Sequence, residues 1–158
     1  MKMRFKTVAV GGTFDYIHKG HQTLLAKAFE CSEKVIIGVT TDNFLNRLGK
    51  IVYNNYEERV RRLREYLLTK YPSERFEIHP LDDYFGPGIY RKEVEALVAS
   101  AETAHRVELA NRRRVEMGLK PLDVVVVGMV LAEDGKPISS SRIRSGEIDG
   151  EGHVMQVE

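Results

Sequence analysis

The chain has 158 residues, of which 42% are hydrophobic and 30% are charged, and its formal net charge is +1 at pH 7. This length predicts one domain with a two- or three-layer core, and the balanced charge excludes an overall field that would attract nucleic acid or an anionic membrane. No apolar stretch approaches the roughly 18 residues of a membrane span, and the N-terminus lacks the apolar core of a signal peptide. We therefore expect a cytoplasmic protein without nucleic-acid or membrane partners.

The first part of the chain has the pattern of a strand, a helix and a second strand. Residues 7–10 are a short apolar run with β-branched side chains, and they end at Gly11 and Gly12. Apolar residues recur at helical spacing over 22–33, and residues 35–39 form another apolar run. Because parallel strands joined by a helix need both faces covered, this unit predicts an open α/β sheet.

The middle of the chain continues the alternation. The apolar stripe over 56–70 predicts a helix that Pro72 stops, and residues 75–79 predict a short strand. Residues 81–88 are rich in turn formers. The run 94–99 suits a strand or a helix, and we favour a helix that enters a short strand.

The last third predicts a helix over 102–117, the clearest buried strand at 123–127, and serines at a helix N-terminus within 138–144. The fold class is therefore α/β, with a Rossmann-like open parallel sheet of about five strands and helices on both faces. We expect the domain to span 1–148 and the acidic, glycine-bearing residues 149–158 to form a mobile tail.

Residues suited to ligand binding follow the predicted strands, at the edge where such a sheet binds its ligands. Gly11 and Gly12 let the backbone approach a ligand closely, and Thr13 adds a hydroxyl. The helix that follows offers its positive N-terminal end to an anion. Gly128 closes the last strand at the same edge. The pattern predicts a phosphate site, although it has neither a Walker lysine nor a GxGxxG fingerprint.

Two histidines stand where the first helix is expected to begin. His18 and His21 are three residues apart, which places them on one helical face, with Lys19 and Gly20 between them. We expect both imidazoles to flank one anion. A metal site is the other interpretation, but Asp15 is the one acidic residue nearby and no cysteine completes a tetrahedral set, so we predict no metal ligands.

Two segments at opposite ends of the chain resemble the signatures of the nucleotidylyltransferase superfamily. GTFD at 12–15, followed by HKGH at 18–21, is similar to the GTFDxxHxGH signature, and ISSSRIR at 138–144 is similar to the ISSTxxR signature. The resemblance extends to about Ile148. It implies an enzyme that joins a nucleoside monophosphate from a nucleoside triphosphate to a phosphorylated acceptor and releases pyrophosphate.

Further features resemble one family of that superfamily, phosphopantetheine adenylyltransferase, in its archaeal and eukaryotic branch. They are the doubled glycine before Thr13, the spacing of Lys50 to YEER at 56–59, the segments 101–103 and 111–114, the LDDYFGP loop at 81–87, and GLKPL at 118–122. Such an enzyme moves AMP from ATP onto 4′-phosphopantetheine and forms dephospho-coenzyme A. The IRG segment of the bacterial branch has no clear counterpart near 98–101. The pantetheine contacts of that branch therefore do not identify pantetheine-binding residues in this chain.

The resemblance implies roles for the matching residues. His21 would stabilise the charge on the α-phosphate, and the arginine favoured in the second signature is Arg144 rather than Arg142. The predicted catalytic residues are His18, His21, Lys50 and Arg144; the predicted ATP-binding residues are Gly11, Gly12, Thr13, Phe14, His21, Gly128, Ser139, Ser140 and Ser141; the predicted acceptor-binding residues are Thr13, Asp15 and Lys50. Mg²⁺ is expected, held mainly through the ATP phosphates.

Other functions remain open at this point. Glycerol-phosphate cytidylyltransferase, FAD synthetase and NMN adenylyltransferase share the HxGH chemistry, but residues 83–87 and 102–103 favour pantetheine. A non-catalytic nucleotide sensor would be expected to lack a histidine or Lys50. The arginines at 112–114 lie near Glu108 and Glu116, which indicates a solvated ion-pairing helix face rather than a nucleic-acid site. The sequence leaves the oligomeric state undetermined.

Overall fold

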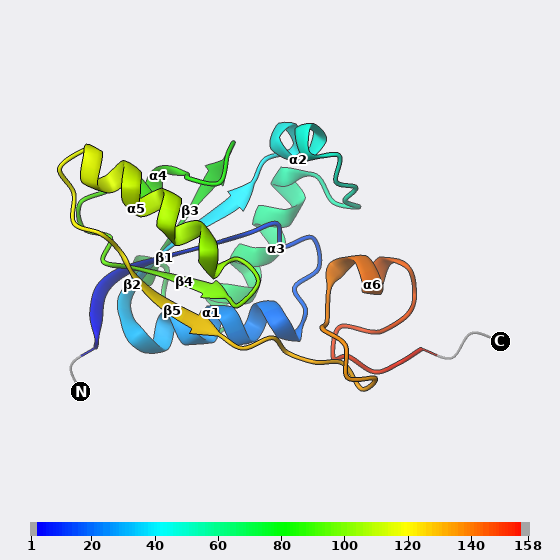
Figure 1. Cartoon of the computed structure of the whole chain (residues 1–158). Coiled ribbons are helices and arrows are strands. Elements are labelled where there is room, and N and C mark those ends of the chain that lie inside the picture. The colour runs from blue at the N-terminus through cyan, green and yellow to red at the C-terminus, as the bar shows by residue number, and fades with distance from the viewer. Residues whose placement is uncertain (1–2, 156–158) are drawn as a thin grey trace.

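The apolar runs form the strands of one parallel sheet in the computed structural model, which describes residues 3–155 (Figure 1). The strands are β1 (Phe5–Gly12), β2 (Ser32–Thr40), β3 (Phe76–Leu81), β4 (Ala96–Ser100) and β5 (Asp123–Val127). Their order is β3-β2-β1-β4-β5, and every neighbouring pair is parallel. The chain moves outward from β1 to β3 and then returns to the other side of β1. The switch point therefore lies between β1 and β4.

Helices cover both faces of this sheet, as predicted. On one face lie α1 (Lys19–Cys31) and α3 (Tyr56–Leu68), and on the other lie α4 (Pro87–Tyr90) and α5 (Val107–Glu116). The remaining elements are α2 (Asp42–Leu48), α6 (Ser140–Arg144) and the 3₁₀ turns η1 (Ser73–Arg75) and η2 (Ala104–Arg106). None of the helices within residues 3–155 is long and apolar enough to cross a membrane.

The strand side chains are buried on alternate faces, which explains their continuous apolar runs. Along β1, Val8 and Val10 pack with the α1 and α3 side chains, whereas Ala9 packs with those of α4 and α5. On α3 the buried side chains of Leu63 and Leu67 continue the first of these two cores.

The expectation for residues 94–99, a helix that enters a short strand, was right for the strand and wrong for the helix. The chain there forms β4, which lies between β1 and β5 and pairs with both. Five consecutive positions pair with β5, from Ala96 with Asp123 to Ser100 with Val127. Hydrogen bonds to two neighbouring strands decide the conformation of this short apolar run. The spacing of its apolar residues does not predict these long-range bonds.

The expectation of a solvated face at residues 112–114 was wrong for Arg114. Its side chain is 1% exposed, and its guanidinium donates to four backbone carbonyls, of Ile89, Arg91, Val94 and Lys120. The predicted helix over 102–117 begins as the turn η2 and becomes α5 at Val107.

Residues 149–155 lie against the rest of the domain. The carbonyl of Gly150 accepts a hydrogen bond from the backbone N–H of Lys19 at 3.0 Å, and the N–H of Met155 donates to the carbonyl of Glu147. Ile148 is 2% exposed and packs against Ala132 and Ile138. The mobility of the tail stays a prediction, and residues 156–158 lie outside the described residues.

Candidate active site

A cavity of about 470 Å³ lies at the carboxyl ends of the strands, at the switch point beside β1 and β4. Three segments that are distant in the sequence meet there: the turn after β1, the segment that ends at Lys50, and the start of α6. The predicted site residues that line the cavity are Gly11, Gly12, Thr13, His18, His21, Lys50, Gly128, Ser139 and Ser140. The fold therefore brings most of the predicted site into one cavity.

Four predicted site residues lie outside the cavity lining: Phe14, Asp15, Ser141 and Arg144. Phe14 is 1% exposed and has a φ of 55°, in the left-handed region that non-glycine residues rarely adopt. Its ring centroid lies 4.9 Å from that of His21. A Cβ on Gly12 would lie 3.0 Å from the Phe14 ring, so the glycine makes room for this ring. Phe14 thus supports His21 from behind, and its contact with ATP stays a prediction.

His18 and His21 hold each other at the start of α1. His18 is the N-cap, and its Nδ1 accepts the backbone N–H of His21 at 3.3 Å, while Nδ1 of His21 accepts the N–H of His18 at 3.4 Å. Their rings stack with centroids 3.7 Å apart. Because both Nδ1 atoms accept, each neutral ring carries its proton on Nε2, which can donate to a ligand.

Gly20 makes room for this histidine pair. A Cβ at Gly20 would lie 2.9 Å from the ring of His18.

Both imidazoles are neutral at pH 7 in this arrangement. Burial lowers the pKa of His18 to about 4. Burial and then the neighbouring His18 lower the pKa of His21 to about 3. The histidines therefore offer hydrogen-bond donors rather than positive charge, and Lys50 is the predicted site residue in the cavity lining that supplies a permanent charge.

Lys50 is positioned by the short helix α2, which the sequence analysis did not identify. The helix begins at the N-cap Thr41, whose hydroxyl accepts the N–H of Phe44 at 3.1 Å, and ends at Gly49, with a φ of 70°. The N–H of Lys50 then donates to the carbonyl of Leu45 at 3.0 Å. At seven residues, α2 is too short for a clear amphipathic period, and its caps were the available signal.

The second signature forms the N-terminus of α6. The hydroxyl of the N-cap Ser139 accepts the N–H of Arg142 at 3.2 Å, and Ser139 and Ser140 line the cavity. The Arg142 side chain pairs with Asp134 and Glu147. Arg142 and Arg144 both lie outside the cavity lining, so the preference for Arg144 over Arg142 stays a prediction.

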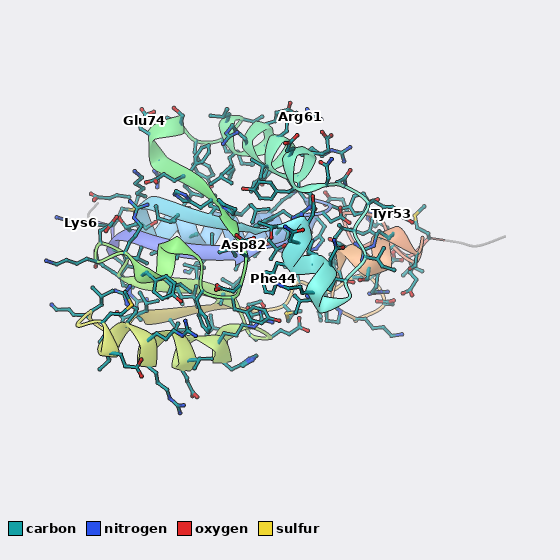
Figure 2. The ribbon with its side chains drawn as sticks, turned by 90° about the horizontal axis from the view of Figure 1, so that it is seen from above. Lys6, Phe44, Tyr53, Arg61, Glu74 and Asp82 are labelled. Carbon is teal, nitrogen blue, oxygen red and sulfur yellow. The ribbon has the colours of Figure 1, made fainter. Side chains whose placement is uncertain are left out.

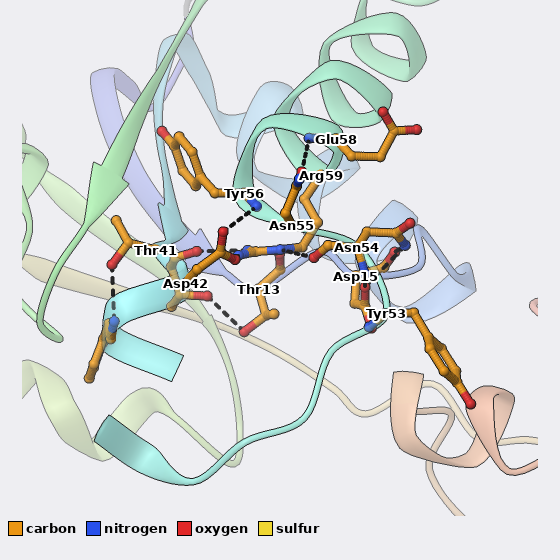
Figure 3. A network of polar contacts seen from close by, with 12 residues as sticks. Thr13, Asp15, Thr41, Asp42, Tyr53, Asn54, Asn55, Tyr56, Glu58 and Arg59 are labelled. Atoms are coloured by element: carbon orange, nitrogen blue, oxygen red, sulfur yellow. Dashed lines mark hydrogen bonds and ion pairs between the residues drawn. The ribbon is translucent and has the colours of Figure 1, made fainter. Parts of the chain in front are cut away.

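Asp15 joins the first signature to two other segments. Its carboxylate is buried and accepts the N–H groups of Tyr53 and Asn54, each at 3.0 Å, as Figure 3 shows. Nη1 of Arg144 lies 2.8 Å from the same carboxylate, and Nη2 of Arg144 donates to the Ser141 hydroxyl. Burial raises the pKa of Asp15, but these hydrogen bonds outweigh it and leave the pKa below its ordinary value.

These contacts assign Asp15 and Arg144 to holding the segments of the site together. The acceptor contact predicted for Asp15, the catalytic contact predicted for Arg144 and the ATP contact predicted for Ser141 stay predictions.

The cavity lining also includes a group of apolar side chains that the sequence analysis largely missed. They include Phe44, Tyr84, Phe85 and Ile89, and the guanidinium of Arg106 lies 4.1 Å from the centroid of the Tyr84 ring. Figure 2 shows Phe44 on α2 near Asp82, which follows β3. These residues come from loops and short helices, where no periodic signal marks them.

Thr40, the last residue of β2, is a further lining residue. Its hydroxyl donates to the hydroxyl of Thr13 at 3.0 Å, across the carboxyl ends of β1 and β2. The expectation of no metal ligands has no direct test here. Among the side chains described within residues 3–155, no group of three His, Cys, Asp or Glu residues could hold a metal ion.

Comparison with known proteins identifies the family. The profile of the family described as cytidylyltransferase-like matches residues 9–146. A phosphopantetheine adenylyltransferase of Methanopyrus kandleri is 47% identical over 92% of this chain and 92% of its own length. That of Methanothermobacter thermautotrophicus is 42% identical over 99% of this chain and 93% of its own.

A solved structure supports the fold. A protein of unknown function from Archaeoglobus fulgidus is 29% identical, with a TM-score of 0.68 over 78% of this chain and 89% of its own. With its cavity at the switch point and relatives that match almost end to end, the chain belongs to the cytidylyltransferase-like family and, within it, to the phosphopantetheine adenylyltransferases.

Proposed function

We propose that this chain transfers AMP from ATP to 4′-phosphopantetheine, which forms dephospho-coenzyme A and pyrophosphate. The observation that carries the proposal is one cavity whose lining combines two chemically different groups of side chains. The polar group includes His18, His21 and Lys50, with Ser139 and Ser140 at the start of α6, and the apolar group includes the aromatic side chains of Phe44 and Tyr84. A nucleotide with a phosphorylated, partly apolar acceptor fits this division.

The chemistry needs no general base. A phosphate monoester has a second pKa of about 6, so the acceptor is largely a dianion at neutral pH. One of its oxygens attacks the α-phosphorus of ATP, and the bond from that phosphorus to the oxygen bridging to the β-phosphate breaks. The electron pair leaves with pyrophosphate, and no proton has to move. Catalysis then depends on positioning the phosphates and stabilising their charge.

The polar residues fit those two tasks. Nε2 of His21 and of His18 donates hydrogen bonds to phosphate oxygens, with His21 directed at the α-phosphate. Lys50 neutralises charge between the acceptor phosphate and the α-phosphate. Ser139 and Ser140, at the start of α6, bind the outer phosphates of ATP. One well-placed donor of this kind contributes about 3 kcal/mol to the transition state.

In the proposed reaction, Mg²⁺ binds together with ATP. Phosphate oxygens and water are the ligands that Mg²⁺ usually has at a nucleoside triphosphate, and they would hold the ion here. When bound, it would neutralise charge on the triphosphate. The chain's own residues would bind the resulting complex.

The test is pyrophosphate release by the purified protein with Mg²⁺, with ATP or CTP as donor. The acceptors are 4′-phosphopantetheine, nicotinamide mononucleotide, FMN and glycerol 3-phosphate, each assayed separately. We expect release that requires both ATP and phosphopantetheine. Release with another pair instead would overturn the acceptor assignment, and no release with any pair would favour a binding role.

A further inference from the structure

Arg59 is a charged residue at a core position of α3. It lies four and eight residues before Leu63 and Leu67, which are both fully buried, so the three share one face of the helix. The Arg59 side chain is 0% exposed, whereas Arg61 and Arg62 form ion pairs with Glu58 on the surface. A leucine at position 59 would continue the apolar stripe, so core packing alone does not explain the arginine.

The guanidinium of Arg59 is fully engaged by the segments that build the phosphate end of the cavity (Figure 3). Its Nη1 donates to the carbonyl of Thr13 at 2.9 Å and to the carbonyl of Thr40 at 2.7 Å. Its Nε donates to the carbonyl of Asn54 at 3.0 Å, and its Nη2 lies 2.9 Å from the Asp42 carboxylate. One side chain thus binds the ends of β1 and β2, the start of α2 and the loop after Lys50.

Nη1 of Arg59 binds the backbone of two residues in the cavity wall. It bridges the carbonyls of Thr13 and Thr40, and the hydroxyls of the same two residues are hydrogen-bonded to each other at 3.0 Å. Both threonines line the cavity. Arg59 therefore holds the backbone carbonyls of two cavity-lining residues whose hydroxyls are bonded to each other.

We propose that Arg59 is a positioning residue, which sets the Thr13–Thr40 pair in the geometry that phosphate transfer requires. The proposal rests on the function given above, because it assigns Thr13 a place at the reacting phosphates. Lysine preserves the charge at position 59 but lacks the planar fork that reaches several carbonyls at once. Arg59→Lys should therefore loosen the pair without removing the charge.

Arg114 provides a matched control. It is also buried, at 1% exposed, and it also binds backbone carbonyls, but those belong to residues around α4 and to Lys120 rather than to the threonine pair. Arg114→Lys should therefore lower thermal stability as Arg59→Lys does, and should leave kcat within about twofold of the unaltered enzyme.

The first experiment is a double-mutant cycle on kcat at a temperature where circular dichroism shows every variant folded. Arg59→Lys should lower kcat by about tenfold to a hundredfold while the KM for ATP changes less. In a Thr13→Ala background the same change should lower kcat by no more than about twofold, since the Thr13 hydroxyl that Arg59 is proposed to position is absent while the carbonyl that Arg59 binds remains. The proposal is overturned if Arg59→Lys keeps the kcat of the unaltered enzyme. It is also overturned if Arg59→Lys lowers kcat by the same factor with and without Thr13→Ala.

The second experiment does not depend on turnover. Amide hydrogen exchange should become faster at residues 12–15 and 40–42 in Arg59→Lys and should remain unchanged there in Arg114→Lys. Unchanged protection in Arg59→Lys overturns the positioning role. If the unaltered protein releases no pyrophosphate with any substrate pair, the proposed reaction fails, and the exchange result still decides whether Arg59 holds the threonine pair.

Discussion

Arg144 Nη1 lies 2.8 Å from the carboxylate of Asp15, so an ion pair joins two residues 129 positions apart in the sequence. The same carboxylate accepts the N–H groups of Tyr53 and Asn54, which follow Lys50 by a few residues. Asp15 thereby connects both signatures to the lysine-bearing loop. A single buried carboxylate thus connects three segments that each contribute residues to the lining of one cavity.

Replacing this carboxylate should weaken both the fold and the site. Asp15→Asn keeps the shape but leaves Arg144 without its counter-ion, and breaking a buried pair in this way costs about 3 kcal/mol. We expect that loss in urea unfolding, with a reduced kcat for pyrophosphate release. The control is Asp134→Asn, which disrupts the ion pair of Arg142 and should cost clearly less. Equal losses in the two variants would contradict the role assigned to Asp15.

The histidine pair should make stability fall in mild acid. The pKa values of about 4 for His18 and about 3 for His21 lie below the ordinary 6.5, so between these values the unfolded chain binds more protons than the folded one. Stability contributed by each neutral histidine is therefore full above pH 6.5 and declines as the pH falls towards 4. The slope should be up to about 1.4 kcal/mol per pH unit for each histidine.

Unfolding by urea at a series of pH values measures this slope, and His21→Gln should remove part of it. His153→Gln is the comparison, because hydrogen bonding to Asp149 raises the pKa of His153. A raised pKa adds stability that is lost as the pH rises, so removing His153 should not reduce the slope on the acid side. An unaltered slope in His21→Gln would show that His21 is not held neutral by the fold.

His21 should matter far more for kcat than for substrate binding. Removing its Nε2 donor with His21→Ala should lower kcat by about a hundredfold to a thousandfold, as expected for a donor directed at transition-state charge. His79→Gln is the control, since His79 lies on β3 outside the cavity lining and bonds to Glu77. Steady-state pyrophosphate release measures both, and a loss below tenfold in His21→Ala would remove His21 from the proposed mechanism.

Arg106 should affect the acceptor and not the nucleotide. Its guanidinium lies over the Tyr84 ring, and both residues line the cavity. Arg106→Ala removes a contact worth about 1 kcal/mol, so the KM for phosphopantetheine should rise by about fivefold while the KM for ATP stays constant. Lys70→Ala, which removes a similar contact with Tyr66 outside the cavity lining, should change neither. A rise confined to ATP would reverse the proposed orientation of the two substrates.

Local sequence patterns predicted the helices and strands whose structure depends on residues close in the sequence. The apolar run at 123–127 became β5 with the same bounds, and the stripe over 56–70 became α3. The glycines, Thr13 and the histidines of the first signature entered the cavity, because a turn after a parallel strand fixes where they lie. Resemblance to known signatures supplied Lys50 and the serines, which periodicity alone does not mark.

The sequence by itself thus determined the parallel sheet, the helices α1, α3 and α5, the family, and most of the predicted site residues that line the cavity. Only the tertiary structure decided that Asp15 pairs with Arg144, that Arg59 and Arg114 are buried, and that no helix precedes the strand β4 within residues 94–99. The physical reason is that a buried charge or a short central strand is stabilised by partners far along the chain. Hydrogen bonds of this kind leave no trace in the local pattern of side chains, because the partners are often backbone carbonyls, which every residue carries.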